Sequence, residues 1–237
     1  MSRHRWIIVS LLTALAGCAP GNPGGVVLNV VEPDDQCVLA VGNNARAVGV
    51  YDPGSGQGYD ATLRVANQLI NLSSTGAAGG TSGVPMADPN VMQVTAAEIE
   101  LQDIQGNPIG GFGNPYRVPV GGSLLPSSDG MAFGEGLVDV EVIPPGVAPL
   151  LAGFVGASVV AEITLFGRTL GDAAVEFPPF VFQIDLPCAT ADGAMFGCLQ
   201  SCPDPAAEEP VCINACRPGQ DDVHFSCAGP YAPCAAM

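Results

Sequence analysis

Residues 97–102 read AEIELQ, and this stretch decides the fold class. Ala97, Ile99 and Leu101 are apolar and alternate with three polar residues. Successive side chains of a β-strand point to opposite faces, so this pattern places one apolar face against a core and one polar face toward solvent. A helix would instead need apolar positions three or four residues apart. The stretch therefore predicts a half-buried strand.

The same alternation recurs along the middle of the chain, and glycine-rich connections separate the runs. Antiparallel sheets joined by turns produce this rhythm, so residues 36–187 are predicted to be all-β, as an antiparallel immunoglobulin-like β-sandwich. A closed barrel stays an alternative, because one-sided alternation fits both forms. Residues 147–152 follow two prolines and could form one short helical turn. The other alternating apolar sets are Tyr59, Ala61, Leu63 and Val65; Val138, Val140 and Val142; Ala161, Ile163 and Leu165; and Phe180, Phe182, Ile184 and Leu186.

Composition narrows the function classes. The net charge is -16, which disfavours binding to nucleic acid. All seven basic residues are arginine, so a Schiff-base lysine and a phosphate-loop lysine are excluded. The two histidines, His4 and His224, are far apart in the sequence and offer little for acid–base catalysis. We therefore expect no enzyme and no cofactor. A hydrolase is the less favoured alternative, because folding alone would have to assemble its acid–base pair.

The N-terminus has the layout of an export signal. Arg3 and Arg5 are followed by a mostly apolar run from Trp6 to Ala16, which is too short to span a bilayer. Residues 1–17 are therefore predicted to be a signal peptide that is removed. An ordinary signal peptide, whose following cysteine joins a disulfide, is the alternative.

Leu15, Ala16, Gly17 and Cys18 resemble the lipobox of bacterial lipoproteins. The resemblance implies cleavage before Cys18 and attachment of acyl chains, palmitate among them, to this cysteine. Two or more acyl chains give stable anchoring to a membrane. Ala19 is not the aspartate that retains many such proteins in the inner membrane, so the resemblance implies the outer membrane. Residues 18–35 are then expected to be the lipidated N-terminus and a flexible tether, because APGNPGG is rich in glycine and proline.

Setting Cys18 aside leaves eight cysteines, an even number that predicts four disulfides in an exported protein. Residues 188–237 are expected to be a disulfide-stabilised tail. Its two C-x3-C segments would place cysteines one helical turn apart, and one possible scheme pairs Cys198 with Cys216, Cys202 with Cys212, Cys37 with Cys188, and Cys227 with Cys234. Eight cysteines allow about 105 connectivities, so the pairing stays open. Zinc is the competing interpretation, although exported thiols oxidise.

Two segments, VDVEVIPPGVAPLL and VVAEITLFGRTLGDAAVEFPPFVFQIDLPC, together with the multi-cysteine tail, are similar to uncharacterised lipoproteins of myxobacteria and related high-GC bacteria. This resemblance implies no active-site residues. The expected function is a membrane-anchored envelope lipoprotein that acts as a non-enzymatic structural or protein-interaction module of the adhesion type. It would be held to the membrane by lipid and would contact an envelope or surface protein. The alternative is an envelope module that binds a cation or a small ligand, and Asp52 and Asp60 are weak calcium candidates for it.

Overall fold

The computed structural model describes residues 24–34, 36–53, 57–71, 88–127, 132–154, 157–186 and 220–221 of the 237-residue chain. These residues form strands and one 3-10 helix. In chain order they are β1 (Gly25–Val31), β2 (Ala45–Arg46), β3 (Val48–Val50), β4 (Tyr59–Asn67), β5 (Met92–Asp103), β6 (Tyr116–Leu124), β7 (Gly134–Ile143), η2 (Ala148–Phe154), β8 (Ser158–Thr169), β9 (Ala174–Glu176) and β10 (Phe180–Asp185).

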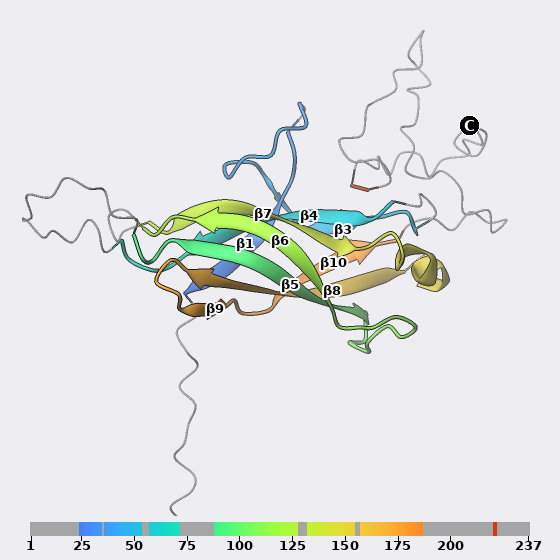
Figure 1. Cartoon of the computed structure of the whole chain (residues 1–237). Helices are drawn as coiled ribbons and strands as arrows, with labels where there is room; N and C mark the ends of the chain where they lie inside the picture. Colours follow the sequence, from blue (N-terminus) through green and yellow to red (C-terminus); the bar gives the residue numbers. More distant parts are fainter. Residues whose placement is uncertain are drawn as a thin grey trace, which may run out of the picture.

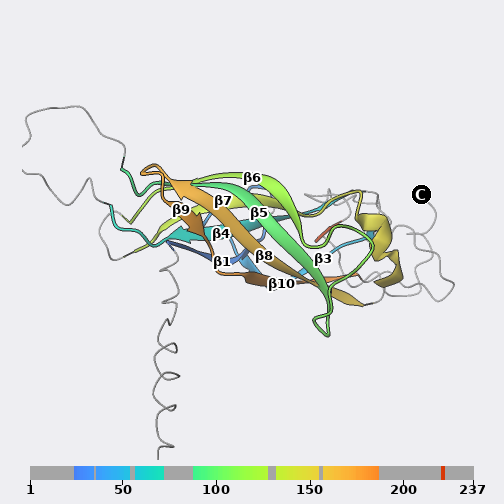
Figure 2. The ribbon, with the colours of Figure 1, turned by 60° about the horizontal axis from the view of Figure 1, so that its bottom comes forward.

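The strands are organised in two hydrogen-bonded sheets (Figure 1), which confirms the all-β class. The four-stranded sheet has the order β2-β1-β4-β7. The six-stranded sheet has the order β3-β10-β8-β5-β6, with β9 paired to β8, and Figure 2 shows β8, β5 and β6 side by side. The pairs are antiparallel apart from β3 with β10, which differs from the wholly antiparallel arrangement that we expected. A parallel pair needs a long connection, and most of the domain separates these two strands in sequence.

Side chains from both sheets form one hydrophobic core. The predicted alternation is confirmed in β5, where Ala97, Ile99 and Leu101 are buried and Glu98 is exposed. It is confirmed in the same way for the apolar sets of β4, β7, β8 and β10, although Phe180 is only partly buried. Removing a large apolar side chain from water contributes about 1.5–3 kcal/mol, so this shared core is the main stabilising feature of the domain.

Two polar residues of β4 are buried. Thr62 lies on the face opposite to the apolar set, as expected, but it is covered there, and its hydroxyl donates a hydrogen bond to the carboxylate of Asp139, its exposed neighbour on β7. Asn67 is fully buried, and its amide donates to the carbonyls of Asn90 (2.9 Å) and Leu124 (3.1 Å). Buried polar groups need such partners. Since Leu124 belongs to β6, Asn67 ties the end of the four-stranded sheet to the six-stranded sheet.

The expected tether, residues 18–35, needs correction at its C-terminal part. Gly25–Val31 forms β1, which pairs with β4 inside the four-stranded sheet. The folded part therefore begins near residue 25 and not at residue 36. A register shift between Val27 and Asn29 interrupts the alternation of β1 and leaves Leu28 exposed, which explains why no period-two pattern marks this strand.

The short helical turn expected at residues 147–152 is confirmed as η2, whose Ala148 and Leu151 are buried against the core. Across the described part of the chain, no helix is long and apolar enough to cross a bilayer. The predicted signal peptide lies outside the described residues.

Candidate functional site

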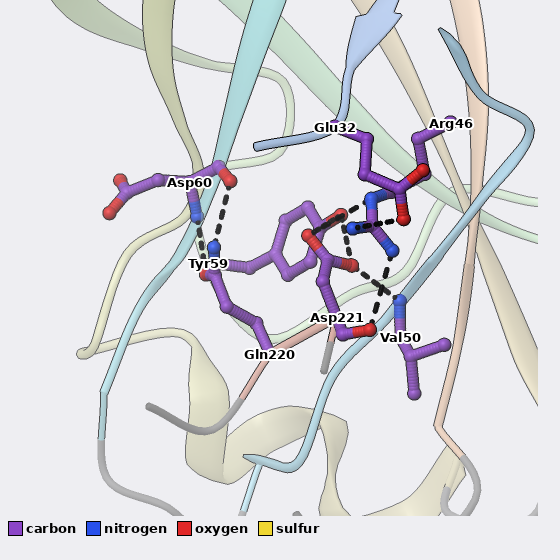
Figure 3. Close-up of polar contacts among 7 residues, drawn as sticks. All are labelled: Glu32, Arg46, Val50, Tyr59, Asp60, Gln220 and Asp221. Carbon is purple, nitrogen blue, oxygen red and sulfur yellow. Dashed lines mark hydrogen bonds and ion pairs between the residues drawn. The ribbon is translucent and has the colours of Figure 1, made fainter. Parts of the chain in front are cut away.

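Gln220 and Asp221 come from the expected cysteine-rich tail, yet they lie against the two-sheet domain. Gln220 forms an isolated antiparallel bridge with Tyr51, and the Asp221 N–H donates to the Val50 carbonyl at 2.8 Å. The tail residues thus meet the chain just after β3 and at the start of β4. We call the group in Figure 3 the tail-docking site; it consists of Glu32, Arg46, Val50, Tyr59, Asp60, Gln220 and Asp221.

Gln220 holds the backbone of Asp60 from both sides. Its side-chain oxygen accepts the Asp60 N–H at 2.8 Å, and its side-chain nitrogen donates to the Asp60 carbonyl at 3.0 Å. The side-chain amide therefore reproduces the pair of hydrogen bonds that a neighbouring strand would give. Gln220 is only 2% exposed, so these bonds are shielded from competing water.

Asp221 is the centre of the tail-docking site. Its Oδ1 accepts hydrogen bonds from the Val50 N–H at 2.9 Å and from the Tyr59 hydroxyl at 3.0 Å. Its backbone carbonyl accepts from the Arg46 guanidinium at 3.3 Å. Asp221 has a φ of 64°, a left-handed conformation that aspartate tolerates better than most residues. The chain bends at this point and directs the carboxylate into the domain (Figure 3).

Arg46 compensates the buried negative charge. Its Nε lies 3.6 Å from Asp221 Oδ2, and another guanidinium nitrogen donates to Glu32 Oε1 at 3.2 Å. The Arg46 and Asp221 side chains are 10% and 11% exposed, whereas that of Glu32 is 44% exposed. Buried charges are tolerated only when they are paired and hydrogen-bonded. Arg46 on β2 and Asp221 in the tail are paired with each other, and each also makes hydrogen bonds to neighbouring groups.

Tyr59, a member of the tail-docking site, packs against Tyr51. The Tyr51 and Tyr59 rings meet edge to face at 5.8 Å, and Tyr59 stacks on Phe182 at 6.4 Å. The Tyr51 hydroxyl donates to the Gln57 carbonyl at 2.6 Å. Burial, with a smaller contribution from the Asp52 carboxylate, raises the pKa of Tyr51 well above its ordinary value. Tyr51 is therefore neutral at physiological pH and acts as a packing group.

The hydrogen bonds of the tail-docking site join the tail to segments that are far apart from it in the sequence, and Arg46 Nε contacts Asp221 as an ion pair without a hydrogen bond. Such an arrangement holds segments together. A catalytic arrangement would need a nucleophile or a base within reach of a substrate. We therefore interpret the site as an attachment point for the tail.

The predicted lipidation residues, Leu15, Ala16, Gly17 and Cys18, lie outside the described residues. Of the eight cysteines expected in disulfides, the structure describes Cys37, which follows β1, has a φ of 61° and is disulfide-bonded. The other seven lie outside the described residues, so the pairing scheme stays a prediction: Cys188, Cys198, Cys202, Cys212, Cys216, Cys227 and Cys234.

The calcium candidates occupy different environments. Asp52 is buried beside Tyr51, whereas Asp60 is exposed at the start of β4. In Figure 3 the Asp60 carboxylate points away from Asp221. Within the described residues, no three carboxylate, thiolate or imidazole side chains come together as metal ligands. The structure therefore adds no geometric argument for a cation at this loop.

Sequence reasoning did not identify Arg46, Gln220 or Asp221. Each stands in a segment without periodicity, and their contacts join residues about 160 to 175 positions apart. One usable signal was present: Arg46 is one of only seven basic residues in a strongly acidic chain. No protein-family model matches the chain, and the search of curated proteins gives no match.

Proposed function

We propose that this protein is an exported, lipid-anchored envelope protein that acts as a non-enzymatic structural or protein-interaction module. In this proposal, Cys18 carries the lipid, the β domain is a compact spacer, and the cysteine-rich tail contributes the contact surface. The outer membrane is its proposed location. The partner would be an envelope or surface protein, bound without nucleic acid or a cofactor.

We further infer that the β domain is an immunoglobulin-like sandwich. Successive long strands exchange sheets in the manner of that fold: β4 lies in one sheet, β5 and β6 in the other, β7 returns to the first, and β8 and β10 lie in the second. The resulting sets, β1-β4-β7 and β10-β8-β5-β6, correspond to the two faces of a Greek-key sandwich. Neither β4 nor β8 contains a cysteine, so the inter-sheet disulfide of antibody domains has no counterpart between these strands.

The functional proposal rests on one observation: the segment that begins β1 and the tail residues contact opposite ends of β4. Gly25, the first residue of β1, pairs with Asn67 at the C-terminal end of β4. Gln220 and Asp221 contact Tyr59 and Asp60 at its N-terminal end. The strand runs over eight residue steps from Tyr59 to Asn67, which is about 26 Å at roughly 3.3 Å per step. An anchor that precedes β1 would thus hold one end near the membrane while the tail joins the other end.

Loss of the lipidation cysteine tests the anchor. Cys18→Ala should move the protein from the membrane fraction to the soluble fraction, because the acyl chains provide the stable attachment to the membrane. Ala19→Ser, which keeps Cys18, is the matched control and should remain with membranes. Membrane retention of Cys18→Ala would contradict the proposal.

The interaction role needs a separate experiment. Amine-directed crosslinkers are unsuitable because the chain has no lysine, whereas the 23 acidic residues offer carboxyl groups. Carboxyl-directed crosslinking in intact cells, followed by purification of the acylated protein, should retrieve a defined envelope protein. Asp221→Ala should reduce that yield, since the variant detaches the tail at its docking site. Equal yields from both proteins would argue against the tail as the contact surface.

A further inference from the structure

The end of the β domain at which β1 begins has a surface of its own. Here Gly25 pairs with Asn67, and Asn67 pairs with Gly134 at the start of β7. In the other sheet, Met92 pairs with both Leu124 and Thr169. The Asn67 amide joins the two sheets through its bond to the Leu124 carbonyl. We call this region the anchor-proximal end.

Four large apolar side chains are exposed at the anchor-proximal end. Ile70 follows β4, Leu125 follows β6, Phe133 precedes β7 and Leu170 follows β8. Their exposed fractions are 57%, 67%, 54% and 45%. Single exposed apolar residues are ordinary, but a group of them on one face indicates a binding surface.

These residues are also linked to one another through the backbone. The Leu170 N–H donates to the Val91 carbonyl next to Met92, and Ile70 forms a bridge with Ser127, two residues after Leu125. A Cβ on Gly134, beside Phe133, would lie 1.7 Å from the Leu125 carbonyl oxygen, so these two segments are in close contact. The four side chains therefore come from neighbouring strand ends.

Charge differs between the two ends of the domain. At the anchor-proximal end, the Glu135 carboxylate accepts from Arg64 Nε at 2.8 Å, Asp172 pairs with Arg168, and the carboxylate of the buried Asp88 accepts from the Asn90 N–H at 2.8 Å. The opposite end carries Asp103 at the end of β5 and Asp185 at the end of β10. An anionic membrane surface repels carboxylates, and pairing with arginine reduces that repulsion. The anchor-proximal end is the better suited of the two to a bilayer.

The chain length before β1 limits how far this end could be from an anchor. Six residue steps separate Cys18 from Gly24 in the sequence, which is at most about 20 Å when fully extended. We propose that Ile70, Leu125, Phe133 and Leu170 enter the interfacial layer of the bilayer and orient the domain upright on the membrane. This inference rests on the proposed lipid anchor at Cys18, and it makes the lipid bilayer the occupant of this surface.

Tryptophan fluorescence offers a direct test. The only tryptophan is Trp6, which the predicted cleavage removes, so the mature protein has no background tryptophan emission. Phe133→Trp places a probe at the anchor-proximal end, with Leu125→Trp as a second probe. Ile104→Trp is the matched control, because Ile104 is similarly exposed (63%) and follows β5 at the opposite end. Full-length acylated protein would be reconstituted in phosphatidylethanolamine–phosphatidylglycerol vesicles, with and without brominated acyl chains.

We expect a blue shift and loss of emission for Phe133→Trp and Leu125→Trp in brominated vesicles, and neither change for Ile104→Trp. Equal quenching of all three probes, or of none, would overturn the inference while the mass of the extracted protein still shows acylation. Absence of the acyl mass would overturn the anchor and this inference together. A blue shift in detergent that grows with protein concentration would assign the surface to a second copy of the chain and also overturn it.

Discussion

Removal of the Asp221 carboxylate should detach the tail from the β domain. Asp221→Ala leaves the buried Val50 N–H and the Tyr59 hydroxyl without this acceptor and deprives Arg46 of one of its two carboxylate partners. An unsatisfied buried polar group costs about 1–3 kcal/mol, and breaking a buried ion pair costs about 3–5 kcal/mol. Because the two side chains of the pair are nearly buried, we expect a loss of about 3–5 kcal/mol for this contact.

Native-state hydrogen exchange separates detachment of the tail from unfolding of the domain. A loss of about 3 kcal/mol corresponds to roughly 100-fold faster exchange of the Val50 and Asp60 amides if the tail opens locally. If the domain unfolds as a unit, the same loss lowers the melting temperature by roughly 10 °C. Asp221→Asn keeps one acceptor oxygen and tolerates the left-handed φ, so it should lose less than the alanine variant.

Glu32→Gln is the matched control for charge. The Glu32 side chain is 44% exposed, and a solvent-exposed ion pair contributes only about 0–1 kcal/mol. Unchanged exchange of both amides and an unchanged melting temperature in Asp221→Ala would refute the docking geometry.

Three further predictions concern single sites. A Cβ at Gly49 would lie 2.2 Å from the Tyr59 hydroxyl, so Gly49→Ala should displace that hydroxyl and destabilise the protein by about 1–3 kcal/mol in denaturant titrations. Hydrogen bonds from the Asn107 side chain and backbone lower the pKa of Asp103. Asn107→Ala should therefore raise the pKa of Asp103 in carboxyl NMR titrations. The stability that this carboxylate contributes is present at neutral pH and is lost as the pH falls through its folded pKa. Because the pKa of Tyr51 is raised on folding, its neutral hydroxyl contributes stability below the unfolded pKa near 10, and this contribution is lost as the pH rises toward the folded pKa. Tyr51→Phe should therefore show weaker alkaline destabilisation than the parent protein.

Local sequence pattern was sufficient to predict the strands that face the core on one side. The apolar sets of β4, β5, β7, β8 and β10 are buried as their spacing required, apart from the partly buried Phe180, because a half-buried strand imposes period two directly on the sequence. β1 escaped prediction because its bulge shifts the register near Leu28. β6 escaped because glycine and proline interrupt its residues; Gly122 is needed there, since a Cβ would lie 2.7 Å from a Val138 methyl group.

The tail-docking site could not be predicted from local pattern. Arg46, Tyr59 and Asp221 lie on three segments that only the folded topology brings together. The residue types did not indicate burial, because aspartate and glutamine in a glycine- and proline-rich segment ordinarily indicate a solvent-exposed turn. Burial of Gln220 and Asp221 is a tertiary effect that needs the start of β4 as a template.

Intact mass spectrometry of the protein extracted from membranes, before and after reduction, tests the proposed lipid anchor most directly. We predict an N-terminus at Cys18 with added acyl mass, and a gain of about eight daltons on reduction, two hydrogens for each of four disulfides. An N-terminus at another residue, or Cys18 without acyl mass, would contradict the anchor. A gain smaller than eight daltons would contradict the even partition of the remaining cysteines.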